Sequence, residues 1–291
     1  MPQAKPRAGK PAWLKVKFPS DAAYFSVSAL LDSKKLHTIC RSAKCPNIGE
    51  CWSQKTATFL ILGDVCSRAC AFCAVTKGIP EPPWPDEPQA VADAAAALGL
   101  KYAVVTSVTR DDLPDGGAAQ FVATIRALRE RIPGVRVEFL IPDFSGNEDA
   151  LRAVIAAAPD IVNHNLETVE AVYPLIGRPK ANYRRSLEVL RRAKALGMVT
   201  KSGLMIGLGE TTDDLVQTLK DLRSAGCDLL TVGQYLQPTR VHAPVAKYYA
   251  PEEFEALKKT ALELGFAGAE TGPLVRSSFH AHRLYDMFTH S

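Results

Sequence analysis

The cysteines of this sequence lie in two triplets, and thiolates are the ligands that bind zinc and iron–sulfur clusters most readily. Six of the seven cysteines fall between positions 40 and 73. They are Cys40, Cys45, Cys51, Cys66, Cys70 and Cys73. The N-terminal residues show no apolar core of a secretory signal, so we expect a cytoplasmic protein in which clustered cysteines indicate metal rather than disulfides. The seventh, Cys227, stands apart, and we expect it to be a buried small apolar residue.

The downstream triplet has the spacing C-x3-C-x2-C over Cys66, Cys70 and Cys73, and Phe72 directly precedes its third cysteine. A structural zinc site usually takes four protein ligands, and a cubic 4Fe–4S cluster normally takes four cysteines. Three thiolates without a local fourth ligand leave one iron open, and an open iron can bind a substrate. A structural metal knuckle is the alternative interpretation of this triplet.

The upstream triplet has the spacing C-x4-C-x5-C over Cys40, Cys45 and Cys51. This is neither the spacing of a zinc finger nor that of a ferredoxin. Again, three thiolates lack a fourth ligand nearby in the sequence.

The elements that must position these residues alternate regularly from residue 57 onward. Short apolar runs end near residues 62, 108, 141, 166, 208 and 236, and helical periods cover 87–100, 117–132, 147–158, 183–197, 213–226 and 251–265. Six strands, each followed by a helix, predict a parallel sheet with right-handed crossovers. Six units are fewer than the eight of a closed barrel, so we predict an α/β fold that is an open, partial (β/α)6 barrel.

Polar residues gather where these strands end, and this is the edge at which barrels carry their chemistry. Thr106 and Ser107 close the second run, although a solvated turn over 106–118 explains them equally well. Asn165 and Glu167 alternate along the fourth run, so we expect them to point the same way and His164 to point the opposite way.

Composition excludes several classes of protein. The sequence is 47% hydrophobic and 23% charged, and 35 basic against 31 acidic residues give a net charge of +4. This charge is too small to suggest nucleic-acid binding, and no run approaches the roughly 18 apolar residues of a membrane span. The early basic residues Lys5, Arg7, Lys10, Lys15 and Lys17 predict either a solvated arm or a docking arm for an acidic partner.

Taken together, the motifs resemble those of the lipoyl synthase family within the radical S-adenosylmethionine (SAM) superfamily. The downstream triplet, placed after the first strand, is similar to the superfamily signature. CPNIGECW (45–52) and RSSF (276–279) resemble the motifs for the family's auxiliary cluster, with Phe279 where the family usually has tyrosine. The resemblance covers almost the whole chain, from residue 10 to residue 281.

The resemblance implies two 4Fe–4S clusters. Cys66, Cys70 and Cys73 would hold the cluster that binds S-adenosylmethionine. Cys40, Cys45, Cys51 and Ser278 would hold the auxiliary cluster. Candidate contacts for S-adenosylmethionine are Phe72, Thr106, Ser107, Asn165, Glu167 and Arg178. The implied domains are an N-terminal extension (1–56), a radical SAM partial barrel (57–266) and a C-terminal segment (267–291).

The implied activity is radical insertion of sulfur at C6 and C8 of a protein-bound octanoyl-lysine, a step of lipoate biosynthesis. It would use two S-adenosylmethionine molecules and take its sulfur from the auxiliary cluster. The expected partners are octanoylated carrier domains (2-oxoacid dehydrogenase E2 subunits and the glycine cleavage H protein) and an electron donor such as ferredoxin or flavodoxin. We expect neither nucleic acid nor membrane as a partner. The alternatives are another radical SAM sulfur-inserting enzyme and a non-catalytic iron–sulfur protein.

Overall fold

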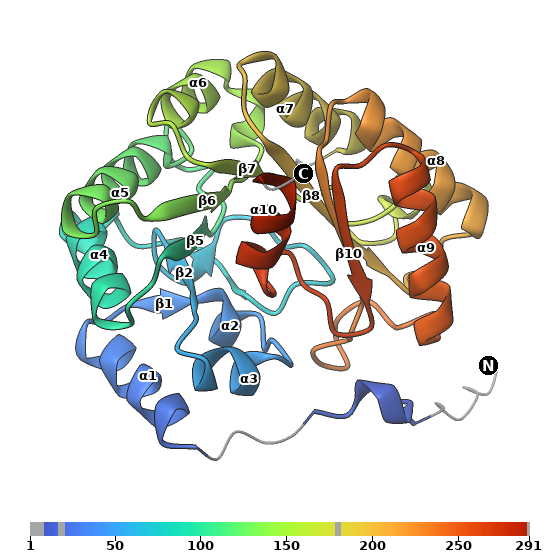
Figure 1. Ribbon diagram of the computed structural model, residues 1–291, viewed down its shortest axis with the longest axis horizontal. Coiled ribbons are helices and arrows are strands. Elements are labelled where there is room, and N and C mark those ends of the chain that lie inside the picture. Colours follow the sequence, from blue (N-terminus) through green and yellow to red (C-terminus); the bar gives the residue numbers. More distant parts are fainter. Residues whose placement is uncertain (1–8, 17–20, 178–181, 290–291) are drawn as a thin grey trace.

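A single curved sheet organises the computed structural model, which describes residues 9–16, 21–177 and 182–289. Within these residues the main sheet has eight strands in the order β1-β2-β5-β6-β7-β8-β9-β10 (Figure 1). Their bounds are β1 His37–Thr38, β2 Thr58–Ile61, β5 Tyr102–Ser107, β6 Arg136–Leu140, β7 Ile161–Asn163, β8 Thr200–Ile206, β9 Leu229–Gln234 and β10 Gly268–Gly272. All neighbours pair in parallel except β1, which is antiparallel to β2 at one edge. The predicted partial barrel is confirmed.

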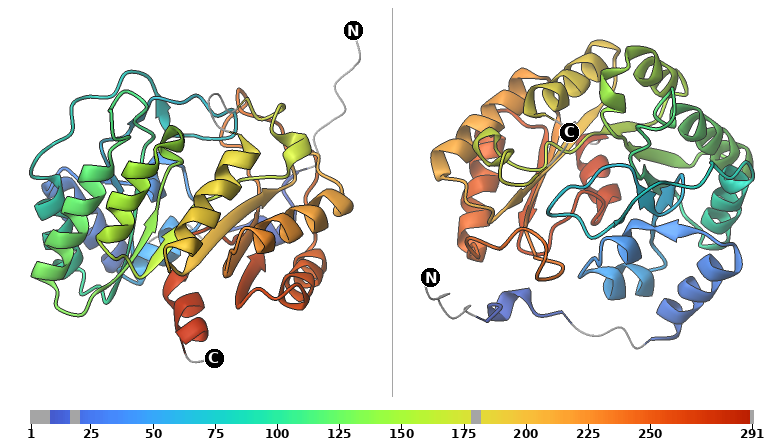
Figure 2. Two further views of the ribbon diagram at one scale, coloured as in Figure 1. Left: turned by 90° about the horizontal axis from the view of Figure 1, so that it is seen from above. Right: turned by 180° about the vertical axis from the view of Figure 1, so that it is seen from behind.

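In the described part of the chain, six helices cover the outside of the sheet, one after each predicted strand (Figures 1 and 2). They are α4 Glu87–Ala97, α5 Ala118–Arg131, α6 Glu148–Ala156, α7 Tyr183–Ala195, α8 Thr212–Ser224 and α9 Pro251–Glu263. Helix α6 begins where the Asn147 side chain accepts a hydrogen bond from the backbone of Ala150, and α9 begins with Pro251 in its first turn. Gly99 takes a left-handed φ of 70° just beyond α4, as helix-terminating glycines do.

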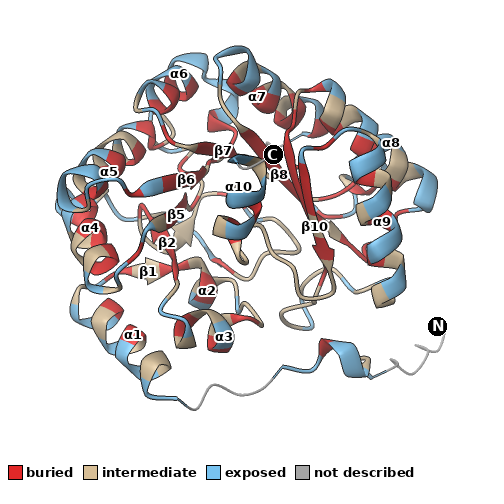
Figure 3. Ribbon diagram, viewed as in Figure 1, coloured by how far each residue is buried: buried red, intermediate tan, exposed pale blue. Residues whose placement is uncertain are grey.

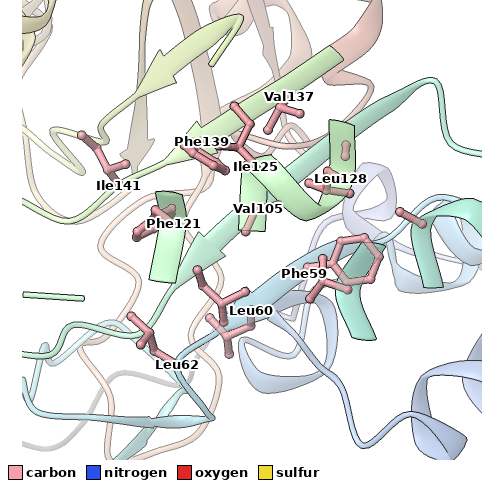
Figure 4. Close-up of a cluster of buried hydrophobic side chains, with 14 of the residues drawn as sticks. Phe59, Leu60, Leu62, Val105, Phe121, Ile125, Leu128, Val137, Phe139 and Ile141 are labelled. Carbon is pink, nitrogen blue, oxygen red and sulfur yellow. The ribbon is translucent and has the colours of Figure 1, made fainter. Parts of the chain in front are cut away.

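Alternation along the strands separates the outer core from the barrel interior. Phe59, Val105 and Phe139 belong to one buried cluster with Phe121 and Ile125 of α5, and Figure 4 shows this cluster. The rings of Phe121 and Phe139 lie 5.0 Å apart, and burying each such side chain contributes about 1.5–3 kcal/mol to folding. Figure 3 shows that the strands are buried and that the helices are exposed on their outer faces. Because side chains alternate along a strand, the residues on either side of Phe59, Val105 and Phe139 point into the barrel interior.

The N-terminal and C-terminal extensions lie around the open side and one end of the barrel (Figure 1). They comprise α1 Ala22–Ser33, α2 Ile39–Ser42, α3 Ile48–Ser53 and α10 Ala281–Thr289 (Figure 1). On α10, Leu284 packs against Ile161 and Leu229 at the amino ends of β7 and β9. Helix α10 therefore closes the end of the barrel opposite the polar strand exits, and it protrudes there in Figure 2.

The structure departs from the sequence prediction at strands β7 and β10. Strand β10 was not predicted, because GAETG lacks an apolar run. Strand β7 ends at Asn163 rather than near residue 166, and Glu167 beyond it has a φ of 75°. No helix in the described part of the chain is long and apolar enough to cross a membrane.

Candidate functional site

The downstream triplet lies on a loop at the carboxyl ends of the strands. Cys66 ends β3 (Val65–Cys66), which pairs with β4 (Thr76–Lys77), and Gly78 donates its N–H to the Cys66 carbonyl at 3.1 Å. The backbone of Cys73 donates to that of Cys70 at 3.2 Å, which folds the loop back on itself. All three cysteines therefore face one cavity of about 230 Å³.

This downstream cavity also gathers the residues that the sequence suggested for S-adenosylmethionine. Its walls include Phe72, Thr106, Ser107, Asn165 and Glu167. Arg178 lies outside the described residues. His164 lines the cavity as well, so the expectation that it points the opposite way is wrong, because β7 ends before it. Its Nδ1 atom lies 2.9 Å from the Ile141 carbonyl oxygen, which is the packing role expected of it.

A buried arginine anchors the downstream loop to the neighbouring strand exits. Arg68 donates to Asp111 at 2.8 Å and to Asp143 at 2.6 Å, and these residues follow β5 and β6. Burial acts to raise the pKa of Asp143, but the hydrogen bond and charge of Arg68 outweigh it, and the pKa lies below its ordinary value. The same balance lowers the pKa of Asp111. Arg68 therefore fixes the loop through charge-assisted bonds in a dry site.

The upstream triplet lies in the gap of the barrel. Cys40 belongs to α2, Cys51 belongs to α3, and Cys45 occupies the turn between them. Their backbones are linked, since Cys45 donates to the Cys40 carbonyl at 3.0 Å. These three cysteines line a second, upstream cavity of about 50 Å³ together with Ser278. The remote serine is thus brought to the triplet, as the sequence motif suggested.

Two further contacts tie the upstream triplet to the C-terminal segment, and sequence reasoning missed both. Asn47 donates its side-chain N–H to the Leu274 carbonyl at 2.7 Å, and His280 Nε2 lies 3.1 Å from Glu50 Oε1. Arg276 also lines the upstream cavity. Asn47 and Glu50 stand inside CPNIGECW, so their place within the motif was the available signal.

Electrostatics at the two triplets suit a cation. Burial, together with a smaller effect of the neighbouring thiolates, raises the pKa of Cys40 to about 11 and those of Cys51 and Cys73 to about 12. Burial likewise raises the pKa of Cys45, while the guanidinium of Arg276 opposes that rise. Sulfurs crowded in a dry cavity remain thiols unless a metal displaces their protons, and soft thiolates favour iron–sulfur clusters. The donor sets therefore fit such clusters.

The described cysteines are not arranged around a single metal ion. Among the described residues, no group of three or more His, Cys, Asp or Glu side chains is arranged to hold one metal ion. A cubic cluster meets each thiolate through a different iron, so its ligands stand further apart than those of a single ion.

The two cavities lie one above the other along the barrel interior. On β2, Thr58 lines the upstream cavity and Leu60 lines the downstream cavity. On β5, Val104 lines the upstream cavity and Thr106 lines the downstream cavity. Residues two apart on a strand share a face and are separated by about 7 Å, so both cavities open toward the same interior space.

Two glycines let the C-terminal segment enter this interior. A Cβ on Gly233 would lie 2.0 Å from the Val275 carbonyl oxygen, and one on Gly203 would lie 2.4 Å from Ser277 Oγ. No side chain could occupy either position without moving the segment. The glycines of β8 and β9 therefore allow another chain segment to approach the strands closely.

Known proteins resemble this chain along almost its whole length. A family model described as the Radical SAM superfamily matches residues 60–222. A lipoyl synthase of Rubrobacter xylanophilus is 55% identical over 282 residues, covering 96% of this chain and 88% of that relative. A lipoyl synthase of Chlorobaculum tepidum is 54% identical over 274 residues, covering 94% of each chain.

Solved structures share the fold at low identity. The FeFe-hydrogenase maturase HydG from Carboxydothermus hydrogenoformans gives a TM-score of 0.54 at 13% identity, over 91% of this chain and 78% of that one. Streptococcus suis SuiB bound to S-adenosylmethionine gives 0.57 at 9% identity, over 78% of this chain and 53% of that one. These likenesses concern the fold alone.

Proposed function

The chain belongs to the lipoyl synthase family of the radical SAM superfamily, and from this premise we propose which of its residues carry the reaction. Its activity is the insertion of two sulfur atoms, at C6 and C8, into an octanoyl-lysine of a carrier protein. When bound, S-adenosylmethionine and the two 4Fe–4S clusters supply the radical, the electron and the sulfur. The chain supplies ligands, orientation and exclusion of water.

The downstream cavity is the S-adenosylmethionine site. Cys66, Cys70 and Cys73 hold its cluster and leave one iron without a protein ligand. Phe72, Thr106, Ser107, Asn165 and Glu167 supply an aromatic face and polar groups for the cofactor, and their common place in one cavity supports this assignment. Arg178 remains a candidate for the carboxylate. Arg68 orients the loop through Asp111 and Asp143.

The upstream cavity is the auxiliary-cluster site, held by Cys40, Cys45, Cys51 and Ser278. The observation that carries the proposal is that Ser278, from the far end of the chain, lines the same cavity as the three cysteines. An alkoxide is a harder ligand than a thiolate and suits sulfide-bound iron less well, so Ser278 is the ligand most easily released. Phe279 supplies no hydroxyl in this cavity.

The octanoyl chain lies between the two cavities, along the interior faces of β2 and β5, to which Leu60 and Val104 contribute apolar side chains. Leu60 and Val104 are buried there, one at each cavity, so the acyl chain meets both sites along a dry path. Residues 1–56 then serve as the extension for the auxiliary cluster, 57–266 as the radical SAM barrel and 267–291 as the segment that returns Ser278.

The chain acts on lipoyl carrier proteins. We assign these as E2 subunits of 2-oxoacid dehydrogenases and the glycine cleavage H protein, with ferredoxin or flavodoxin as electron donor. We place the enzyme in the cytoplasm, because six of its seven cysteines are assigned to clusters rather than to disulfides, and reducing compartments favour thiolates in that role.

The test is anaerobic incubation of the reconstituted protein with an octanoyl-lysyl peptide, S-adenosylmethionine and dithionite, followed by mass spectrometry. We expect a peptide heavier by two sulfur atoms and stoichiometric 5′-deoxyadenosine. A different sulfur-inserting enzyme would leave this peptide unchanged, and a non-catalytic iron–sulfur protein would release no 5′-deoxyadenosine.

A further inference from the structure

One hydrogen bond joins the C-terminal segment to the wall of the downstream cavity. Ser277 donates its hydroxyl proton to Asn165 Oδ1 at 2.7 Å. Asn165 lines the downstream cavity, whereas Arg276 and Ser278, on either side of Ser277, line the upstream cavity. We propose that Ser277 is a positioning residue that sets the Asn165 amide for S-adenosylmethionine. The proposal rests on the proposed function, because it takes the downstream cavity as the cofactor site.

The strand beneath this contact is shaped to admit it. A Cβ on Gly203 would lie 2.4 Å from Ser277 Oγ and 2.6 Å from Asn165 Oδ1, closer than side-chain carbons approach such atoms. Only a residue without a side chain leaves room at this point of β8 for both polar groups. The hydrogen bond therefore depends on three chain segments that are far apart in the sequence.

The direction of the hydrogen bond decides what the amide offers to a ligand. A side-chain amide has an acceptor oxygen on one side and a donor NH2 on the other. Because Ser277 donates to Oδ1, the amide oxygen faces the C-terminal segment and Nδ2 is left for the cavity that Asn165 lines. S-adenosylmethionine carries mostly acceptors on its carboxylate, ribose and adenine, so the donor side of the amide is the useful one.

Removing the hydroxyl removes this preference. The amide of Asn165 then samples the flipped orientation, in which its oxygen faces acceptor atoms of the cofactor. A net hydrogen bond is worth about 0.5–1.5 kcal/mol, which corresponds to roughly a twofold to tenfold change in affinity. Ser277 thus acts on cofactor binding through Asn165 although it neighbours the auxiliary ligand Ser278.

Adjacency of Ser277 and Ser278 also couples the two sites. If the Ser277–Asn165 hydrogen bond increases the affinity for S-adenosylmethionine, then bound S-adenosylmethionine must stabilise that hydrogen bond by the same free energy. It thereby stabilises the position of residues 274–280, which include Ser277. Binding of S-adenosylmethionine should therefore slow backbone hydrogen exchange in this segment, although it lies at the other cavity. This readout is independent of turnover.

The experiment measures the dissociation constant of S-adenosylmethionine by anaerobic equilibrium dialysis on the protein reconstituted with both clusters. Ser277→Ala should raise it about fivefold, with unchanged iron content and unchanged cluster absorption. Asn165→Ala should raise it at least as much, and adding Ser277→Ala to that variant should change it little. Ser278→Ala, the neighbouring control, should lower iron content instead.

Asn165→Asp tests the amide orientation directly. A carboxylate still accepts from Ser277 but presents an oxygen to the cavity, so it should bind the cofactor more weakly than Asn165→Ala does. In hydrogen exchange, the slowing of residues 274–280 on cofactor addition should be present in the unaltered protein and absent in Ser277→Ala.

Three results would overturn the inference. They are an unchanged dissociation constant in Ser277→Ala, effects of Ser277→Ala and Asn165→Ala that multiply, or loss of iron in Ser277→Ala. If Ser277→Ala does not fold, the inference then stands or falls on Asn165→Asp binding more weakly than Asn165→Ala. Failure of the proposed function is a separate result, in which the unaltered protein itself does not bind S-adenosylmethionine.

Discussion

The side-chain nitrogen of the buried Asn47 lies 2.7 Å from the carbonyl oxygen of the half-buried Leu274, in a hydrogen bond that joins distant parts of the chain. Asn47 stands in the turn between Cys45 and Cys51, and Leu274 stands four residues before Ser278. The bond therefore fixes the distance between the cysteine loop and the segment that brings the serine. An auxiliary site whose ligands come from both ends of a chain needs such a tie.

Replacing Asn47 should loosen this site. Asn47→Asp places a carboxylate oxygen against the Leu274 carbonyl, so it removes the donor and leaves two acceptors facing each other in a buried place. We expect the reconstituted protein to lose about half of its iron on desalting, since the downstream cluster of about four irons is untouched. Iron per chain is the measurement.

Asn147→Ala is the matched control for Asn47. It removes an asparagine that caps α6 on the outside of the barrel. It should cost about 1 kcal/mol of stability and leave the iron content unchanged. Equal iron in Asn47→Asp and in the unaltered protein would refute the role of the tie.

The two triplets should separate cleanly in their effects. Cys66→Ala should abolish 5′-deoxyadenosine formation, because it removes a ligand from the S-adenosylmethionine site. Cys45→Ala should keep some uncoupled cleavage and form no lipoyl product, because it removes a ligand from the auxiliary site only. Cys40→Ala should lose about half of the roughly eight irons of two 4Fe–4S clusters. Chromatography of 5′-deoxyadenosine and mass analysis of the peptide check these outcomes.

Cys227→Ala serves as the control for the cysteine variants. Cys227 is fully buried, donates to the Leu229 carbonyl, and belongs to neither cavity. Its replacement should lower stability without changing iron or product. If Cys66→Ala and Cys45→Ala abolish cleavage equally, the division of labour between the triplets is wrong.

The sequence predicted the six βα units well because their apolar runs and helix caps are local signals. Asn147 and Pro251 mark the starts of two helices, because an asparagine N-cap and a first-turn proline favour a helix start whatever the rest of the fold is. Cys227 was likewise expected to be buried, and it is. Strand β10 was missed because its sequence, GAETG, has no apolar run. Its backbone nevertheless pairs with β9 over five residues, which the sequence pattern does not reveal.

The residue types and their spacing do not predict which residues far apart in the sequence come into contact. The spacing of three cysteines indicates a metal but not the partner that completes the site. Ser278 could be suggested only through the family motif. Asn47 stands inside that family's other motif, but the motif does not indicate that Asn47 bonds to Leu274, and no sequence pattern indicates that Ser277 bonds to Asn165. Gly203 and Gly233 also read as ordinary strand glycines until the C-terminal segment is seen beside them.

Acid should weaken the anchor of the downstream loop. The pKa of Asp143 is lowered in the folded protein, so its charge contributes stability above the ordinary pKa near 3.9. That contribution is lost as the pH falls through the lower folded value. We expect Asp143→Asn to be less stable than the unaltered protein at pH 7 and the difference to shrink below about pH 4.

Thermal unfolding at a series of pH values checks this prediction. Acid also labilises iron–sulfur clusters, but that loss is common to both proteins and cancels in the difference between them. A difference between Asp143→Asn and the unaltered protein that stays constant from pH 7 to about pH 3 would contradict the prediction.

A buried ion pair inside the barrel gives the last prediction. Lys201 lies 2.9 Å from Glu138, both are 0% exposed, and Tyr102 and Asn163 also donate to the Glu138 carboxylate. Removing one partner leaves an uncompensated charge in a dry interior, which costs about 3–5 kcal/mol. Lys201→Met should therefore lower the unfolding midpoint strongly. Arg184–Glu170 is the matched exposed pair, and Glu170→Gln should cost no more than about 1 kcal/mol.

The double variant Glu138→Gln with Lys201→Met separates charge from packing. It removes both charges, so it should recover much of the stability that Lys201→Met loses. Neutral side chains do not have the large free-energy cost of burying an unpaired charge. Its remaining deficit measures the hydrogen bonds of Tyr102 and Asn163 to this position. Tyr102 also lines the upstream cavity, so a double variant that regains stability but not auxiliary iron would show that the pair holds that wall in place. A double variant less stable than Lys201→Met would mean that packing, rather than charge, dominates this layer of the barrel.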